Sequence, residues 1–222
     1  MVLDEKYDVI VVGGGHAGCE AAYSAAKMGA NVLMITMNMQ TIGQMSCNPA
    51  MGGVAKGQIV REIDALGGGS ARITDKSMIQ FRMLNRSKGP ALWSPRVQSD
   101  RMLFAQYWRE LLEETPGLNM FQDMVTGLNV SDNTVHGVRT ALGLTFEAQT
   151  VVLTSGTFMN GLIHVGDQNF GGGRGRGYPP TPLSAEGRLY RSPRLLASSA
   201  RLVCSPRLLA SSSRLACSPR LL

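Results

Sequence analysis

Cysteine, histidine and aromatic residues are scarce in this 222-residue chain, which holds four Cys, three His and 6% aromatics. His136 and His164 have no carboxylate or thiol partner at ligand spacing, so we expect no metal site. Cys204 and Cys217 occupy the same position of a repeated segment, and their spacing therefore reflects duplication. No apolar run approaches the roughly 18 residues that span a bilayer, and the first residues show no signal pattern. We therefore expect a cytoplasmic protein without membrane contact.

Acidic residues are absent from residues 188–222, which carry seven Arg. From Ser192 onward these residues form a 13-residue repeat of the type SPRLLASSARLVC. Residues 1–187 hold 15 basic and 16 acidic side chains, so the formal charge of +6 comes from this tail. Each repeat contains a helix-interrupting proline, and the period is shorter than that of stacking repeats. We predict a domain over residues 1–187 and a disordered tail over residues 188–222.

A run of basic residues lies within the domain, where residues 72–109 carry eight Lys and Arg against Asp75 and Asp100. Such a run could bind the phosphates of a cofactor, a nucleic-acid backbone or a partner surface. It could equally form an ordinary solvated helix face, and the sequence leaves both interpretations open.

A glycine-rich turn follows the β-branched run Tyr7–Val12, which is typical of a buried parallel strand. An Ala-rich helix comes next, and the apolar run Asn31–Thr36 predicts a second parallel strand. This order is that of a dinucleotide-binding fold, in which the three spaced glycines make the tight turn, admit a pyrophosphate and let helix pack on strand. The residues of the turn are Gly13, Gly14, Gly15, His16, Ala17 and Gly18. We expect His16 to shape the loop rather than to act as acid or base.

The carboxylate that usually ends the second strand and binds a ribose hydroxyl is missing here. Thr36 or Asn38 could still bind the ribose there as a neutral partner. Farther along, Val97–Glu114 has helical spacing, and the segment from Asn119 to Leu153 is typical of short antiparallel strands that return to a core strand.

Small residues follow this last strand, at Thr154, Ser155 and Gly156. They indicate either a second strand that contacts the cofactor or a plain junction between strand and turn.

The segment GQMSCNPAMGGVAKG at residues 43–57, with Cys47 at its centre, narrows the class of protein. Together with REIDALGG at residues 61–68 and LNRSKGPA at residues 84–91, it resembles the MnmG (GidA) family of FAD-dependent tRNA-modifying proteins. The resemblance extends from about Tyr7 to about Ser184. Members of that family are much longer, so it covers their amino-terminal part only.

The resemblance implies an α/β fold with a Rossmann-like FAD-binding domain, a parallel sheet and an antiparallel β-insertion, here incomplete. It also implies modification of carbon five of the tRNA wobble uridine together with an MnmE-like GTPase. The implied cofactors are FAD, NADH and a methylene-tetrahydrofolate carbon donor, and the intact family implies a homodimer. Val125 and Thr181 align with positions that contact FAD in the family.

Cys47 is the leading candidate for chemistry, because a thiol near a helix start and a flavin can act as nucleophile or redox partner. The alternative is a small buried residue in a tight loop. Two other functions stay open for the chain, namely a small-molecule FAD oxidoreductase and an inactive truncated fragment. Co-purified tRNA would separate the first from the tRNA-modifying function, and a flavin spectrum would test the second.

Overall fold

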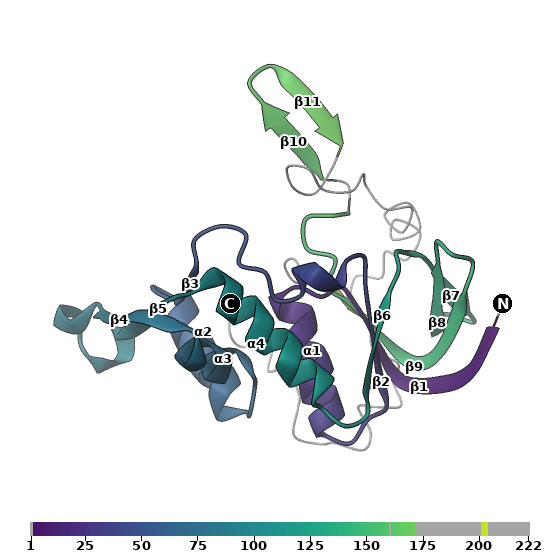
Figure 1. The fold of residues 1–222 in the computed structure, drawn as a ribbon, viewed down its shortest axis with the longest axis horizontal. Helices are drawn as coiled ribbons and strands as arrows, with labels where there is room; N and C mark the ends of the chain where they lie inside the picture. Colours follow the sequence, from purple (N-terminus) through teal and green to yellow (C-terminus); the bar gives the residue numbers. More distant parts are fainter. Residues whose placement is uncertain (1, 160, 172–200, 204–222) are drawn as a thin grey trace.

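The structure is a computed structural model that describes residues 2–159, 161–171 and 201–203 (Figure 1). Its largest part is a mixed sheet with strand order β6-β2-β1-β9-β8-β7. The strands of this sheet are β1 (Val2–Val12), β2 (Val32–Thr36), β6 (Leu118–Gln122), β7 (Val125–Ser131), β8 (Thr134–Thr140) and β9 (Thr145–Leu153). A short strand, β12 (Arg201–Val203), pairs antiparallel with the end of β9. Thr181, the predicted boundary near residue 187 and the rest of the predicted tail lie outside the described residues.

The middle of this sheet is parallel, because β1 pairs in parallel with both β2 and β9. Successive side chains of a strand point to opposite faces. Val9 and Val11 accordingly join one hydrophobic cluster, which includes Trp108, while Ile10 and Val12 join a second cluster on the other face. Burial on both faces explains the continuous apolar runs of β1 and β2.

Strand β8 pairs antiparallel with both β7 and β9, as predicted. Asp132 and Asn133 form the two-residue turn between β7 and β8 with positive φ angles of 51° and 57°, the conformation that such hairpins favour. The prediction is wrong for Asn119, which lies in β6, because β6 pairs in parallel with β2. Its partner is distant in sequence, and a short apolar run does not reveal the direction of pairing.

The helices of the described residues cover one face of the sheet or extend from it (Figure 1). Their bounds are α1 (His16–Lys27), α2 (Lys56–Ala65), α3 (Ser70–Lys76) and α4 (Arg101–Glu113). The predicted helix over Val97–Glu114 therefore begins later than expected. Asp100 caps α4 by accepting hydrogen bonds from the N–H groups of Met102 (2.8 Å) and Leu103 (3.0 Å), and this cap sets the helix start. None of the described helices is long and apolar enough to cross a membrane.

A second, three-stranded sheet was not predicted. It has the order β3-β5-β4 and lies at the end of the molecule opposite β7 and β8 (Figure 1). Its strands are β3 (Ala50–Gly52), β4 (Met78–Leu84) and β5 (Ser94–Ser99), with the 3-10 turns η2 (Arg86–Lys88) and η3 (Pro90–Leu92) between β4 and β5. Another 3-10 turn, η1 (Met39–Thr41), follows β2, and β10 (Leu162–Val165) and β11 (Gln168–Gly171) form a separate hairpin.

Candidate functional site

The glycine turn joins β1 to α1 in a conformation that requires its glycines. Gly13 has a φ of +111°, and its N–H donates to the carbonyl of Ile35 at 2.8 Å. A Cβ on Gly18 would overlap the carbonyl oxygen of Gly13 and lie 2.8 Å from Thr154 Oγ1. The helix therefore packs directly against the turn, which is the role predicted for Gly18.

The start of α1 is open where a diphosphate would approach. Gly15 is the N-cap residue, and no side chain caps the helix. A Cβ built on Gly15 meets nothing within 4 Å, so a ligand atom can come close to the backbone there. First-turn N–H groups lack partners within a helix and form its positive end. The described residues therefore fit the pyrophosphate of a dinucleotide such as FAD.

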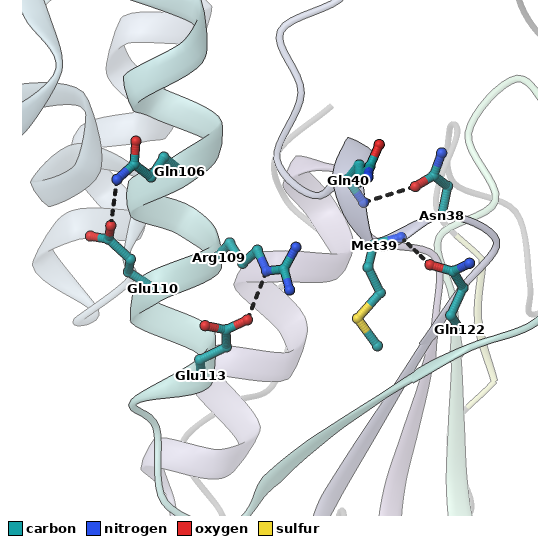
Figure 2. Close-up of polar contacts among 8 residues, drawn as sticks. All are labelled: Asn38, Met39, Gln40, Gln106, Arg109, Glu110, Glu113 and Gln122. Atoms are coloured by element: carbon teal, nitrogen blue, oxygen red, sulfur yellow. Dashed lines mark hydrogen bonds and ion pairs between the residues drawn. The ribbon is translucent and has the colours of Figure 1, made fainter.

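The end of β2 offers neutral polar groups for a ribose. Thr36 is buried, whereas Asn38 is half-buried and its Oδ1 accepts from the N–H of Gln40 at 2.8 Å (Figure 2). Gln122 on β6 lies opposite Thr36 in register, and its Oε1 accepts from the N–H of Met39 at 3.0 Å (Figure 2). Sequence reasoning missed Gln122, because this residue reaches the end of β2 only through the parallel pairing of β6 with β2.

The thiol loop, residues 43–49, begins against the glycine turn. The N–H of Gly43 donates to the carbonyl of Gly14 at 2.9 Å, and Nε2 of His16 lies 3.1 Å from the carbonyl oxygen of Gly43. The His16 ring also contacts Phe104 edge to face, with 5.4 Å between ring centroids. His16 thus connects the glycine turn, the thiol loop and α4.

Cys47 is exposed within the thiol loop. The guanidinium of Arg101, at the start of α4, donates through Nη2 to the carbonyl of Cys47 at 2.7 Å and so holds the backbone of the loop. Cys19 has the opposite character. It is a free thiol buried in α1, where desolvation raises its pKa to about 12. Of these two described cysteines, only Cys47 is accessible to a ligand.

The structure separates the other predicted residues. Thr154 lies beside the glycine turn, where its hydroxyl donates to the carbonyls of Val12 (2.9 Å) and Gly13 (3.2 Å). Gly156 follows it with a φ of +58° and an exposed position. The side chain of Val125 is buried in the cluster beneath β7, so only its backbone is left to contact a cofactor. Of Val125, Thr154 and Gly156, Thr154 is therefore the one whose side chain bonds to the glycine turn.

Comparison with known proteins agrees with this arrangement. The family model described as "Glucose inhibited division protein A" matches residues 8–193. The curated tRNA uridine 5-carboxymethylaminomethyl modification enzyme MnmG of Flavobacterium psychrophilum is 65% identical over 170 residues, which are 77% of this chain and 27% of the relative. The same-named enzyme of Cytophaga hutchinsonii is 67% identical over 169 residues, which are 76% of this chain and 27% of the relative. The chain thus spans about a quarter of the length of these relatives.

Solved structures show the same relationship. The structure of Aquifex aeolicus GidA in its form II crystal has a TM-score of 0.80 and 48% sequence identity, over 84% of this chain and 31% of that chain. The GidA-related protein of Thermus thermophilus has a TM-score of 0.59 at 23% identity, over 83% of this chain and 68% of that chain, and this likeness concerns the fold alone. With the family model matching most of its residues, the chain belongs to the glucose inhibited division protein A (GidA) family.

Proposed function

We propose that this chain is the FAD-binding part of an enzyme that modifies carbon five of the tRNA wobble uridine. The observation that carries the proposal is the uncapped start of α1 at Gly15, joined through Gly43 to a loop with an exposed thiol. The relatives that share this region are named as tRNA uridine modification enzymes. Because they are much longer, the complete reaction would need residues that correspond to the rest of their length.

The residues of the site would divide the binding of FAD among them. The turn of Gly13 to Gly18 would hold the pyrophosphate at the positive end of α1. Asn38 and Gln122 would contact the ribose, with Thr36 packed beneath them and the backbone of Val125 on the adenosine side. Thr154 and Gly156 would border the cofactor where β9 ends. When bound, FAD would supply hydride transfer during formation of the methylene bridge to uridine.

Cys47 would stand on the side of the thiol loop that faces the flavin ring, where it would act as nucleophile or redox partner. Arg101 holds the backbone of this loop by its contact with the Cys47 carbonyl. NADH, methylene-tetrahydrofolate, an MnmE-like GTPase and a second copy of the enzyme remain proposals that rest on the family alone. The same holds for a cytoplasmic location.

Protection of Cys47 provides a test that needs no catalytic turnover. The full chain would be titrated with FAD by flavin fluorescence, and alkylation of Cys47 by iodoacetamide would then be followed by peptide mass spectrometry. We expect FAD to slow alkylation of Cys47, because its ring would cover the thiol. ADP is the matched control, since it fills the phosphate and ribose positions without reaching the thiol loop, and it should leave the rate unchanged.

Two results would contradict the proposal. Absence of FAD binding would support the inactive fragment. Binding of FAD without protection of Cys47 would place the flavin ring away from the thiol loop. This result would favour a small-molecule FAD oxidoreductase whose substrate does not bind at Cys47.

A further inference from the structure

The three-stranded sheet carries two arginines directly opposite each other. Arg82 on β4 pairs in register with Arg96 on β5, which in turn pairs with Gly52 on β3. Directly opposed residues of antiparallel strands project from the same face. The neighbouring row on that face contains two glutamines, also directly opposed. We name this surface the arginine face and define it by Gly52, Gln80, Arg82, Arg96 and Gln98.

The positive charge of the arginine face is not balanced within the described structure. No carboxylate among the described residues forms an ion pair with Arg82 or Arg96, and the sequence has no Asp or Glu between Asp75 and Asp100. Like charges that lie directly opposite each other destabilise a sheet. An anion bound to both guanidinium groups would remove this repulsion.

The other basic residues of the run over residues 72–109 are divided by their contacts. Arg72 donates to the hydroxyl of Tyr23 at 3.1 Å, and Arg101 donates to the carbonyl of Cys47. Arg109 forms an ion pair with Glu113 at 2.7 Å, and Figure 2 shows these two side chains on α4. Lys76 lies 5.8 Å from the centroid of the Tyr107 ring. The side chains with no hydrogen bond or ion pair to a described residue are Arg82, Arg86, Lys88 and Arg96. The two ends of the run are therefore tied to the protein, and its middle is available to a ligand.

Exposed aromatic and apolar side chains accompany these free cations. Trp93 and Leu92, at the end of the β4–β5 hairpin, are 37% and 51% exposed. The indole N–H of Trp93 donates to the carbonyl of Arg86 at 3.1 Å, which holds the ring beside the basic turn η2. Cations that track a backbone, together with aromatic rings on which bases stack, are the features of surfaces that bind single-stranded nucleic acid.

The arginine face continues directly into the thiol loop. The loop ends at β3, whose Gly52 stands next to Arg96, and the N–H of Ser99 on β5 donates to the carbonyl of Pro49 at 2.8 Å. Ala50, the first residue of β3 after the loop, pairs in register with Gln98 of the arginine face. A strand bound along the face would therefore run toward Cys47.

We propose that the arginine face and Trp93 bind the phosphodiester backbone of single-stranded RNA and direct one of its bases to the thiol loop. The inference rests on the proposed function, because it assigns the surface on which that RNA substrate lies. The arginine face supplies charge and Trp93 supplies stacking, and neither carries chemistry of its own.

RNA binding by the full chain tests this assignment. The probe is a fluorescein-labelled anticodon stem-loop transcript with a uridine at the wobble position, followed by fluorescence anisotropy over a series of salt concentrations. In Arg82→Gln/Arg96→Gln, we expect the salt slope of log K to fall by about 1.4 and affinity at 0.1 M salt to fall about 25-fold, since each phosphate contact to a single strand contributes a slope of about 0.7. Inorganic phosphate at equal concentration should not compete.

The matched control is Lys6→Gln/Arg139→Gln, which removes the same charge from β1 and β8 at the other end of the molecule (Figure 1). Its affinity for RNA should stay within about twofold of that of the unmodified chain, because only the general attraction by net charge is weakened. FAD affinity, measured in parallel, should be equal in all three proteins. Loss of FAD binding with unchanged RNA binding would assign the face to the dinucleotide and overturn the proposal.

Cross-linking separates the arginine face from the Arg-rich residues 188–222, which are present in every variant. With 4-thiouridine at the wobble position, we expect cross-linked peptides from residues 43–53 or 78–99. Cross-links confined to residues 188–222, or equal RNA affinity in the double variant and its control, would refute the inference. Self-association that disappears only in Arg82→Gln/Arg96→Gln, without an RNA effect, would instead assign the face to a second copy of the chain.

Discussion

Two glycines of the same turn are expected to respond to alanine in opposite ways. A methyl group on Gly18 would collide with the Gly13 carbonyl and with Thr154 Oγ1, whereas a methyl group on Gly15 would meet no protein atom within 4 Å. Gly18→Ala should therefore damage the fold, and Gly15→Ala should damage ligand binding. The pair distinguishes a glycine needed for packing from one needed for a cofactor.

The magnitude for Gly18→Ala follows from two opposing effects. Overpacking costs up to about 3 kcal/mol, and the obstacle here is backbone, which cannot turn aside like a flexible side chain. Alanine regains about 1 kcal/mol of helix propensity. The free energy of unfolding should fall by about 2 kcal/mol, which corresponds to a melting temperature about 4–8 °C lower for a chain of this size. For Gly15→Ala, the loss of stability should stay below about 1 kcal/mol, since this is an N-cap position.

Urea unfolding in the absence of cofactor and titration with FAD measure the two effects separately. Gly15→Ala should weaken FAD binding by about tenfold or more, equivalent to about 1.4 kcal/mol, because the methyl group occupies the approach to the helix start. Unchanged FAD affinity in Gly15→Ala would refute the placement of the pyrophosphate at α1. Unchanged stability in Gly18→Ala would refute the tight packing of α1 against the turn.

Three further outcomes are expected. Burial raises the pKa of the Cys19 thiol from 9.0 to about 12, so the contribution of the neutral thiol to stability is complete below pH 9. Between pH 9 and 12 the free energy of unfolding should fall by up to about 1.4 kcal/mol per pH unit. Urea titrations of Cys19→Ala should no longer show this pH dependence. Glu20 accepts from the N–H of Ser70 at 2.6 Å at the start of α3, so Glu20→Gln should cost about 1–2 kcal/mol in the same assay, whereas a cost near zero would show that the charge is not needed there. Arg82→Gln should raise the free energy of unfolding by about 0.2–1 kcal/mol without RNA, since it removes like-charge repulsion, and a lower melting temperature would contradict the inferred repulsion.

The amino-terminal half of the site could be predicted because its signals are local. A buried strand, three spaced glycines and an Ala-rich helix follow each other within a short segment, and each glycine has one steric reason for its position. The resemblance of the segment around Cys47 to the GidA family added what periodicity could not provide. The assignments of residues such as Asn38 and Val125 to a cofactor stay predictions.

The parts that sequence reasoning missed depend on partners far along the chain. Gln122 joins the end of β2 only because β6 pairs with it in parallel, and the opposition of Arg82 and Arg96 exists only after β4 and β5 have formed their register. The run that includes Val97 was predicted as helix, since a short strand before a strong helix has no periodicity of its own. A run of basic residues likewise does not reveal which members are held by other side chains.

The contact between Thr154 and the glycine turn has a consequence for how the protein is made. Its hydroxyl bonds to Val12 across 142 positions of sequence, so the turn is completed only after β9 has left the ribosome and inserted beside β1. Contacts of such long separation slow folding, because a long loop must close before they form. Until that insertion, the nascent glycine turn lacks its hydrogen bonds from Thr154, and a dinucleotide would meet an incomplete binding turn. Loading of the cofactor is therefore expected to be a late event in biogenesis that follows sheet closure.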